Sequence, residues 1–276
     1  MPFLIAMVYR GARVGGLFEL QKCDFEMGCR LHFPLHYPDA KAGKEDVERT
    51  KTDAKAEYDR KPPAKRVNFE ALGIVEPFHC PWKELMCHWC PPVVSGTTDF
   101  AVLRDVAKLK LLDSYLQRNV TTLTWSGPRY FLVPVRLEMV LKGTCDSLSS
   151  ICLPSDADLD QLERDPNYGG PIEPVHSNES ACVHLNSSNQ GNNKTDKPDQ
   201  KSLVEHCSRL TIGFVSEGGF SYRYGHGTGI GFIALPCLLT ENTKTLLQRS
   251  HTGALIVLVR KPTTFQYRFA RMRIDR

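Results

Sequence analysis

The chain has 276 residues, 41% of them hydrophobic and 24% charged, which is the composition of a globular protein able to bury a core in one or two domains. The longest apolar stretch near its start, "PFLIAMVY", has eight residues and is far too short to cross a membrane. No basic residue precedes it and no small-residue cleavage site follows it, so we expect no secretion signal, no membrane partner, and reduced thiols at the ten cysteines.

The formal net charge of +4 conceals a segregation of charge along the chain. Residues 145–200 contain ten acidic and three basic residues, so this stretch carries −7 and the remainder carries +11. A basic body beside one acidic segment favours a polyanionic partner such as nucleic acid. An ordinary solvated surface with an acidic loop is the alternative.

The first predicted element is a strand at residues 2–11, followed by a turn or bulge at Gly15 and Gly16. An isolated strand needs a neighbour, and no partner strand precedes this one. We therefore expect the chain to be the C-terminal part of a longer protein.

Residues 43–61 are polar on nearly all sides, which predicts a helix that faces solvent or lies against a charged partner. Glu57 and Lys61 have the i,i+4 spacing of a helical ion pair. Two prolines then end the helix. Four cations crowd around them: Arg60, Lys61, Lys65 and Arg66.

The rest of the chain predicts a succession of strands and helices. A helix at residues 99–118 has a 3.6-residue apolar stripe and Asp99 as its N-cap. The Asn- and Ser-rich residues 176–201 lack periodicity and predict a disordered insertion. The other expected elements are strands at 129–143 and 150–155, a helix at 156–165, strands at 209–217, 220–224 and 230–235 with a Gly-Gly turn and a Gly-rich turn between them, a helix at about 236–249, and strands at 254–260 and 266–274. This order predicts an α+β fold of mixed or antiparallel sheets with a barrel-like C-terminal domain.

The glycine-rich stretch "GHGTGIG" at residues 225–231 matches neither the dinucleotide-binding nor the P-loop spacing. A strand, not a helix, follows it. These glycines therefore predict a tight hairpin or close backbone packing.

Residues 79–90 contain the one metal-ligand candidate in the sequence. Cys87 and Cys90 have a spacing that suits zinc, and Cys80 with His79 would complete four ligands, but no second such pair lies within the usual reach. The alternative is a helix whose large apolar side chains pack inward, with the thiols as small apolar fillers.

No nucleophile motif and no convergent carboxylates on rigid elements are present, so the sequence predicts no catalytic residue and no cofactor. The final strand instead combines aromatic and cationic side chains: Phe265, Tyr267, Phe269, Arg271 and Arg273 share one face. We expect the aromatic rings to enter the barrel core and the arginines to project toward RNA phosphates. A core strand whose arginines pair with local acids is the alternative.

Four motifs follow one another in the first third of the chain: "YRGARVGGLFE", "HFPLHYPDA", "RKPPAKRVNF" and "PFHCPW". Three more lie in the second half: "WSGPRYFLVPVRLEMVLKG", "GFVSEGGFSYRYGHGTGIGFIAL" and "QYRFARMRI". The first four resemble the POPLD region of the family formed by the largest protein subunit of nuclear ribonuclease P and RNase MRP. The last three resemble the C-terminal domain of the same family.

The resemblance implies that RNA is the catalyst and that this chain is a non-catalytic, RNA-binding scaffold in a ribonucleoprotein of the nucleus and nucleolus. That particle removes the 5′ leader of precursor tRNA and processes precursor rRNA. The implied partners are ribonuclease P RNA, MRP RNA and other protein subunits. The implied fold is similar to glycine-cleavage T-protein, an α+β fold with a C-terminal barrel, although we carry over no folate chemistry.

The resemblance also divides the chain into a POPLD-like region at 1–98, shortened at its N-terminus, and a C-terminal domain at 99–175 and 202–276, interrupted by the insertion at 176–201. We expect nine cations to touch the RNA backbone: Arg10, Arg13, Arg60, Lys61, Lys65, Arg66, Arg268, Arg271 and Arg273. Two other functions stay open, a T-protein-like folate-dependent transferase and a zinc-dependent protein interaction module.

Overall fold

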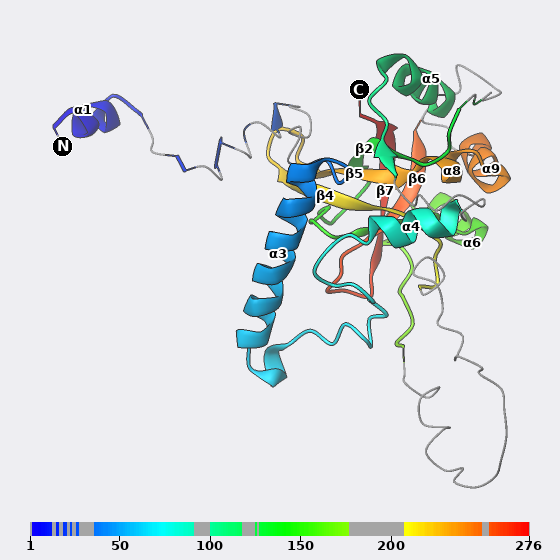
Figure 1. Cartoon of the computed structure of the whole chain (residues 1–276), viewed down its shortest axis with the longest axis horizontal. Helices are drawn as coiled ribbons and strands as arrows, with labels where there is room; N and C mark the ends of the chain where they lie inside the picture. Colours follow the sequence, from blue (N-terminus) through cyan, green and yellow to red (C-terminus); the bar gives the residue numbers. More distant parts are fainter. Residues whose placement is uncertain are drawn as a thin grey trace, which may run out of the picture.

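Figure 1 shows the chain in a computed structural model. The structure describes residues 2–12, 15–16, 19–20, 23, 26–27, 36–90, 100–117, 125, 127–176, 207–249 and 254–275. Of the insertion predicted at 176–201, only His176 is described, and its backbone N–H donates to the carbonyl of Ala71. Residues 177–201 lie outside the described part.

A closed antiparallel barrel forms the centre of the fold, and it confirms the barrel-like C-terminal region predicted from the sequence. The six strands follow the order β2-β5-β4-β3-β6-β7, and β7 pairs again with β2. A short strand, β1, pairs in parallel with the start of β2 outside this ring. The strands are β1 (Ala101–Val102), β2 (Phe131–Met139), β3 (Ser150–Cys152), β4 (Thr211–Ser221), β5 (His226–Ala234), β6 (Leu255–Arg260) and β7 (Tyr267–Ile274).

Pairing register and pleat decide which side chains fill the barrel. Leu137 of β2 lies opposite Met272 of β7 and Gly229 of β5, and paired residues point to the same face. Leu137 and Met272 are fully buried. The interior is therefore apolar, with glycines on the face that β5 contributes.

Two of these glycines permit other parts of the chain to approach β5 closely. A Cβ atom at Gly231 would lie 2.2 Å from the backbone oxygen of Phe214, and one at Gly229 would lie 2.5 Å from Cβ of Cys145. The prediction of close backbone packing is thus confirmed. The predicted Gly-Gly turn at Gly218 is wrong, because this residue sits inside β4, and the turn of the β4–β5 hairpin falls at residues 222–225.

Helices cover the barrel on several sides (Figure 1). On the outer face of β4 and β5, the ring of Trp82 packs edge-on against Phe214 at 5.4 Å and Phe232 at 5.7 Å. The described helices are α1 (Pro2–Tyr9), α3 (Lys41–Arg60), the 3-10 turn η1 (Pro63–Lys65), α4 (Trp82–Trp89), α5 (Val106–Leu116), α6 (Asp156–Arg164), α8 (Leu235–Leu238) and α9 (Glu241–Arg249). Among them, none combines the length and apolar character needed to cross a bilayer.

Two predicted elements at the N-terminal side differ from the structure. Residues 2–9 form helix α1 and not a strand, because a short apolar run has no periodicity that separates the two. Helix α5 begins at Val106, since the carboxylate of Asp105 accepts hydrogen bonds from the backbone N–H groups of Ala107 and Lys108. Asp99 lies outside the described residues. The polar helix predicted at 43–61 is confirmed as α3, and Lys61 pairs with Glu57 at 3.0 Å.

Replacing Gly231 tests the role of the glycines in closing the barrel. We expect Gly231→Ala to lower the free energy of unfolding by about 1–3 kcal/mol, because the atom that the new Cβ meets belongs to the backbone. Gly219→Ala in β4 is the matched control, since its Cβ would meet nothing within 4 Å. Denaturant midpoints measure both changes, and equal midpoints for the two variants would contradict this packing.

Candidate nucleic-acid interface

The basic end of α3 divides into structural and free cations. Nε of Arg66 donates to the carbonyl of Lys61 at 2.8 Å and Nη2 donates to that of Asp59 at 2.5 Å. The Arg66 guanidinium also lies over the ring of Tyr58, 5.6 Å from its centroid. Arg66 therefore caps the helix C-terminus, where unpaired carbonyls collect.

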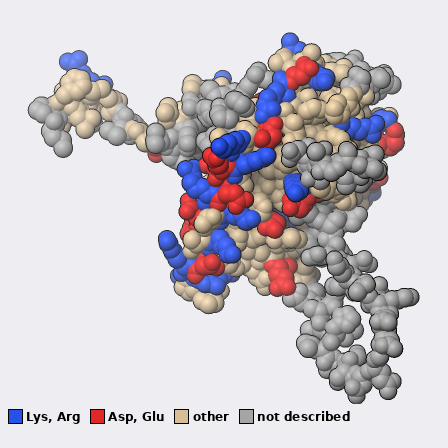
Figure 2. Space-filling view, in the orientation of Figure 1, with Lys and Arg blue, Asp and Glu red and all other residues tan. Residues whose placement is uncertain are grey.

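Arg60 and Lys65 are exposed at the same end and have no ion pair with any described residue. Elsewhere along α3, lysines and arginines alternate with acids, as Figure 2 shows. Lys44, Lys51 and Lys55 of α3 also have no ion pair with a described residue, but acids alternate with them along the helix, whereas no acid lies between Asp59 and Glu70. RNA contact by this segment stays a prediction; in the structure Arg66 anchors the end of the helix and Lys61 is paired with Glu57.

The arginines of β7 do not act as one group. Arg273 is exposed, and the half-buried Arg271 lies opposite Glu138 of β2 in the strand register. Arg268 lies on the opposite face of the strand, and its Nη1 donates to the carbonyl of Gly169 at 3.1 Å. Of the three, Arg273 has the most accessible side chain.

The expectation that the aromatic rings of β7 enter the barrel core is wrong. Tyr267 and Phe269 lie on the same face as Arg271, which is the outer face, whereas Ala270 and Met272 face the interior. The rings are nevertheless buried, because the segment after α6 covers them, with Tyr168 5.9 Å from Phe269.

The predicted cations do not converge on one surface. Arg10 follows α1, far to the left in Figure 1, the basic end of α3 lies at the bottom, and the C-terminal end of β7 lies at the top. Arg13 lies outside the described residues. The predicted RNA contacts would therefore need an RNA that spans the molecule, or only some of them are used.

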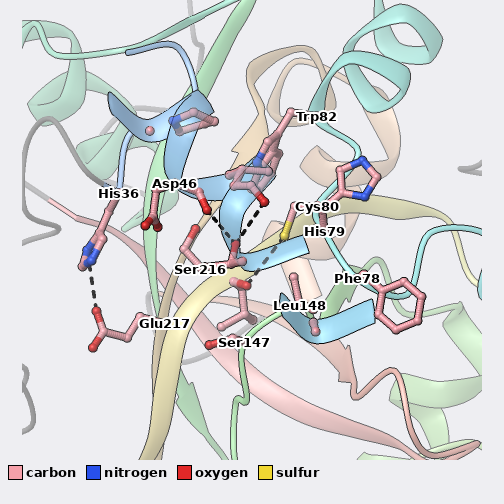
Figure 3. Close-up of a pocket in the computed structure, with 16 residues that line it drawn as sticks. His36, Asp46, Phe78, His79, Cys80, Trp82, Ser147, Leu148, Ser216 and Glu217 are labelled. Carbon is pink, nitrogen blue, oxygen red and sulfur yellow. Dashed lines mark hydrogen bonds and ion pairs between the residues drawn. The ribbon is translucent and has the colours of Figure 1, made fainter. Parts of the chain in front are cut away.

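A cavity of about 320 Å³ lies between α3, residues 78–82 and β4, and Figure 3 shows the side chains around it. Its polar edge includes His36, whose Nδ1 is 3.6 Å from Oε2 of Glu217. Leu148 also lines it and has a φ of 64°, which is uncommon for a residue with a side chain. Burial raises the pKa of the Cys80 thiol in its wall to about 12, so this sulfur is not a nucleophilic thiolate at neutral pH.

The structure does not gather the three candidate zinc ligands. Sγ of Cys80 lies 4.0 Å from the carbonyl of Val215, and Sγ of Cys90 lies 3.6 Å from that of Arg129. Within the described ranges, no three His, Cys, Asp or Glu side chains are placed to hold a metal ion. Residues 82–89 instead form α4 with Trp82, Leu85 and Met86 buried, as the packing alternative predicts.

A buried polar network joins residues 70–76 to the barrel. Nη1 of Arg260, a residue only 1% exposed, donates to the carbonyl of Leu72 at 2.7 Å. The Arg260 guanidinium lies over the ring of Tyr267, whose hydroxyl donates to Oε2 of Glu173 at 2.6 Å. Ser208 donates to the same carboxylate through its hydroxyl and its backbone N–H. Buried charges of this kind are costly unless hydrogen-bonded, so the network fixes the loop in one position.

The electrostatic character of Glu173 follows from these contacts. Burial alone would raise the pKa of its carboxyl, but hydrogen bonds from Ser208, Tyr267 and His176 together hold that pKa below its ordinary value. The carboxylate is therefore ionised at neutral pH. The sequence did not indicate this network, because its members come from five separate segments.

Family comparisons agree with the order of these segments. The model of the POPLD (NUC188) domain matches residues 1–82, and the model of the POP1 C-terminal domain matches residues 131–196 and 180–276. The chain belongs to the POP1 family. The second match contains all six barrel strands, whereas α3 and the 70–76 loop fall within the first. The Arg260 network and the cavity thus lie where the two POP1 regions meet.

Three curated relatives are similar to this POP1 family member. The human protein "Ribonucleases P/MRP protein subunit POP1" is 25% identical over 402 aligned residues, which cover all of this chain and 39% of the relative. The Caenorhabditis elegans subunit popl-1 is 26% identical over 60% of this chain and 22% of its own length. The Schizosaccharomyces pombe subunit pop1 is 38% identical over 28% of this chain and 12% of its own length. The chain therefore spans well under half the length of the relatives that it matches, and the predicted family resemblance is confirmed.

The pKa of Glu173 predicts how pH acts on stability. A folded-state pKa below the unfolded value means that the ionised carboxylate stabilises the protein above about pH 5.5, and that this contribution disappears as pH falls through the folded pKa. We expect Glu173→Gln to destabilise the protein at pH 7 and to differ less from the wild type at low pH. Unfolding free energies across this range measure the difference, and a gap that stays constant down to pH 3 would contradict the assignment.

Proposed function

We propose that this chain acts as a non-catalytic RNA-binding subunit of the ribonuclease P/MRP ribonucleoprotein. The observation that carries the proposal is the ordered match of the POPLD and POP1 C-terminal family models, together with relatives named as ribonucleases P/MRP protein subunits. In this role the protein supports removal of the 5′ leader of precursor tRNA and processing of precursor rRNA, and the RNA performs the chemistry.

Charge and geometry support RNA as the ligand. The chain is basic outside residues 145–200, and Arg60, Lys65 and Arg273 are exposed cations. Cations of this kind position an RNA backbone without reading its sequence. The proposed partners are ribonuclease P RNA, MRP RNA and other subunits of the complex, and the proposed location is the nucleus and nucleolus.

The wider alternatives have less support. The thiols of Cys80 and Cys90 lie near different backbone carbonyls, which does not favour the zinc module. Likeness of the barrel to glycine-cleavage T-protein stays a proposal about fold only, and we propose no folate chemistry, since a fold does not by itself determine a function.

Binding of the purified chain to ribonuclease P RNA tests the proposal. We expect it to bind this RNA more tightly than an unrelated structured RNA of equal length, with affinity falling steeply between about 50 and 200 mM salt. Absence of any RNA binding by the folded chain at low salt would contradict the proposed function.

Neutralising the free end of α3 tests which cations bind. Replacing Arg60 and Lys65 by Gln should reduce the slope of log affinity against log salt by roughly 0.7 to 0.9 for each lost phosphate contact. Lys244→Gln is the control, because this exposed cation lies on α9 and its Nζ is already paired with Glu241 at 2.5 Å. A slope unchanged in the double variant would remove the end of α3 from the RNA interface.

A further inference from the structure

The tip of the β4–β5 hairpin extends past the barrel wall. Toward the tip, the pairing of β5 with β2 ends at Thr228, and the pairing of β4 with β3 ends at Phe214. Residues 219–227, which we call the hairpin tip, therefore pair only within the β4–β5 hairpin among the named strands. Two contacts reach the tip from Glu26, which accepts from the backbone N–H of Tyr222 and from Nη1 of Arg223.

Three aromatic side chains stand exposed on the hairpin tip. Phe220 is 42% exposed, Tyr222 is 77% exposed and Tyr224 is 48% exposed. The rings of Phe220 and Tyr222 meet edge-on at 5.4 Å, and the ring of Tyr224 lies 6.0 Å from that of His226. Such a cluster leaves a large apolar area in water, which is unfavourable unless a ligand covers it.

Cations accompany these rings. The guanidinium of Arg223 lies over the Tyr224 ring, 5.5 Å from its centroid. The exposed Lys142 belongs to the neighbouring loop, whose Gly143 carbonyl approaches Gly227 so closely that a Cβ there would lie 2.3 Å away. Positive charge is thus available on the tip itself and on the loop beside it.

This composition favours nucleic acid over a protein partner. Residues 219–227 read "GFSYRYGHG" and contain no acidic side chain, and the cations beside the rings favour a polyanionic partner. Aromatic faces beside Arg or Lys are the arrangement on which unpaired bases stack while the cations bind phosphates. The glycines leave the backbone open to a close approach.

We propose that the hairpin tip binds unpaired nucleotides of RNA, stacking bases on Phe220, Tyr222 and Tyr224 and placing phosphates on Arg223 and Lys142. This inference rests on the proposed RNA-binding function and names the class of RNA element that one surface recognises. Nothing in the cation pattern of the sequence points to this hairpin, because it contains a single arginine.

The test uses the whole chain and two fluorescent probes, an oligouridine of about 12 nucleotides and an RNA duplex of equal length. The single strand should bind more tightly than the duplex. Replacing Phe220, Tyr222 or Tyr224 by Leu should weaken single-strand binding by about fivefold to a hundredfold for each ring that stacks, while Tyr222→Phe retains the affinity.

Tyr130→Leu is the matched control, because Tyr130 is 40% exposed outside the hairpin tip. The salt slope separates the two kinds of contact, since it should stay unchanged in the Leu variants and decrease in Arg223→Gln. A thermal melt of each variant shows that the fold is retained, and Arg223→Gln gives an independent reading where a Leu variant is unstable.

The outcomes separate this inference from the function on which it rests. If the chain binds ribonuclease P RNA but the Leu variants bind oligouridine as the wild type does, the hairpin inference is overturned and the function stands. Equal binding of single strand and duplex also overturns it. If the wild type binds no RNA at all, both proposals are lost.

Discussion

The buried guanidinium of Arg260 is the constraint on which the arrangement of the two matched regions depends. The Arg260 side chain projects from β6 on the outer face of the barrel. There its guanidinium lies over the ring of Tyr267, and its Nη1 donates to the carbonyl of Leu72. A charged group that is 1% exposed requires such partners, and leaving it unpaired would cost about 3–5 kcal/mol. The loop at residues 70–76 is therefore held in one place beside the barrel. Glu173 and Ser208 extend the same network, so a single polar cluster joins the POPLD match to the POP1 C-terminal match.

This junction holds the two matched regions together, so that their separated surfaces can bind one ligand. The barrel provides a rigid centre, closed by β7 against β2, and projects the β4–β5 hairpin beyond its wall. Helix α3 stands beside the barrel and carries free cations at its end (Figure 1). RNA held by separated contacts of this kind would be positioned by backbone charge and by stacking, which are both independent of base sequence.

Much of the barrel was predictable from the sequence because its strands are rich in β-branched and aromatic residues. The approximate positions of the strands and the polar helix α3 follow from such patterns, although β4 was predicted as two strands. The eight apolar residues of α1 fit a strand or a helix equally well. A glycine pair is typical of a turn, and only the structure shows that Gly218 lies in a strand against the backbone of Cys145. The candidate interface was predicted less well. Arg66 was predicted to contact RNA because it lies in a cluster of cations, but its guanidinium caps a helix. The partner of Arg260 lies 188 residues away in the chain. Long-range partners of this kind leave no local pattern in the sequence. The exposure of the aromatic residues in the hairpin likewise depends on which strands lie beside it, and the sequence does not show this.

We have proposed that this POP1 family member binds the RNA of ribonuclease P and MRP. Ultraviolet crosslinking of the tagged protein in the cells that express it, followed by sequencing of the attached RNA, tests this most directly. The account predicts strong enrichment of ribonuclease P RNA and MRP RNA over their abundance in the cell, with crosslinked peptides from the end of α3 and the hairpin tip. Recovery of RNAs merely in proportion to their abundance would contradict it.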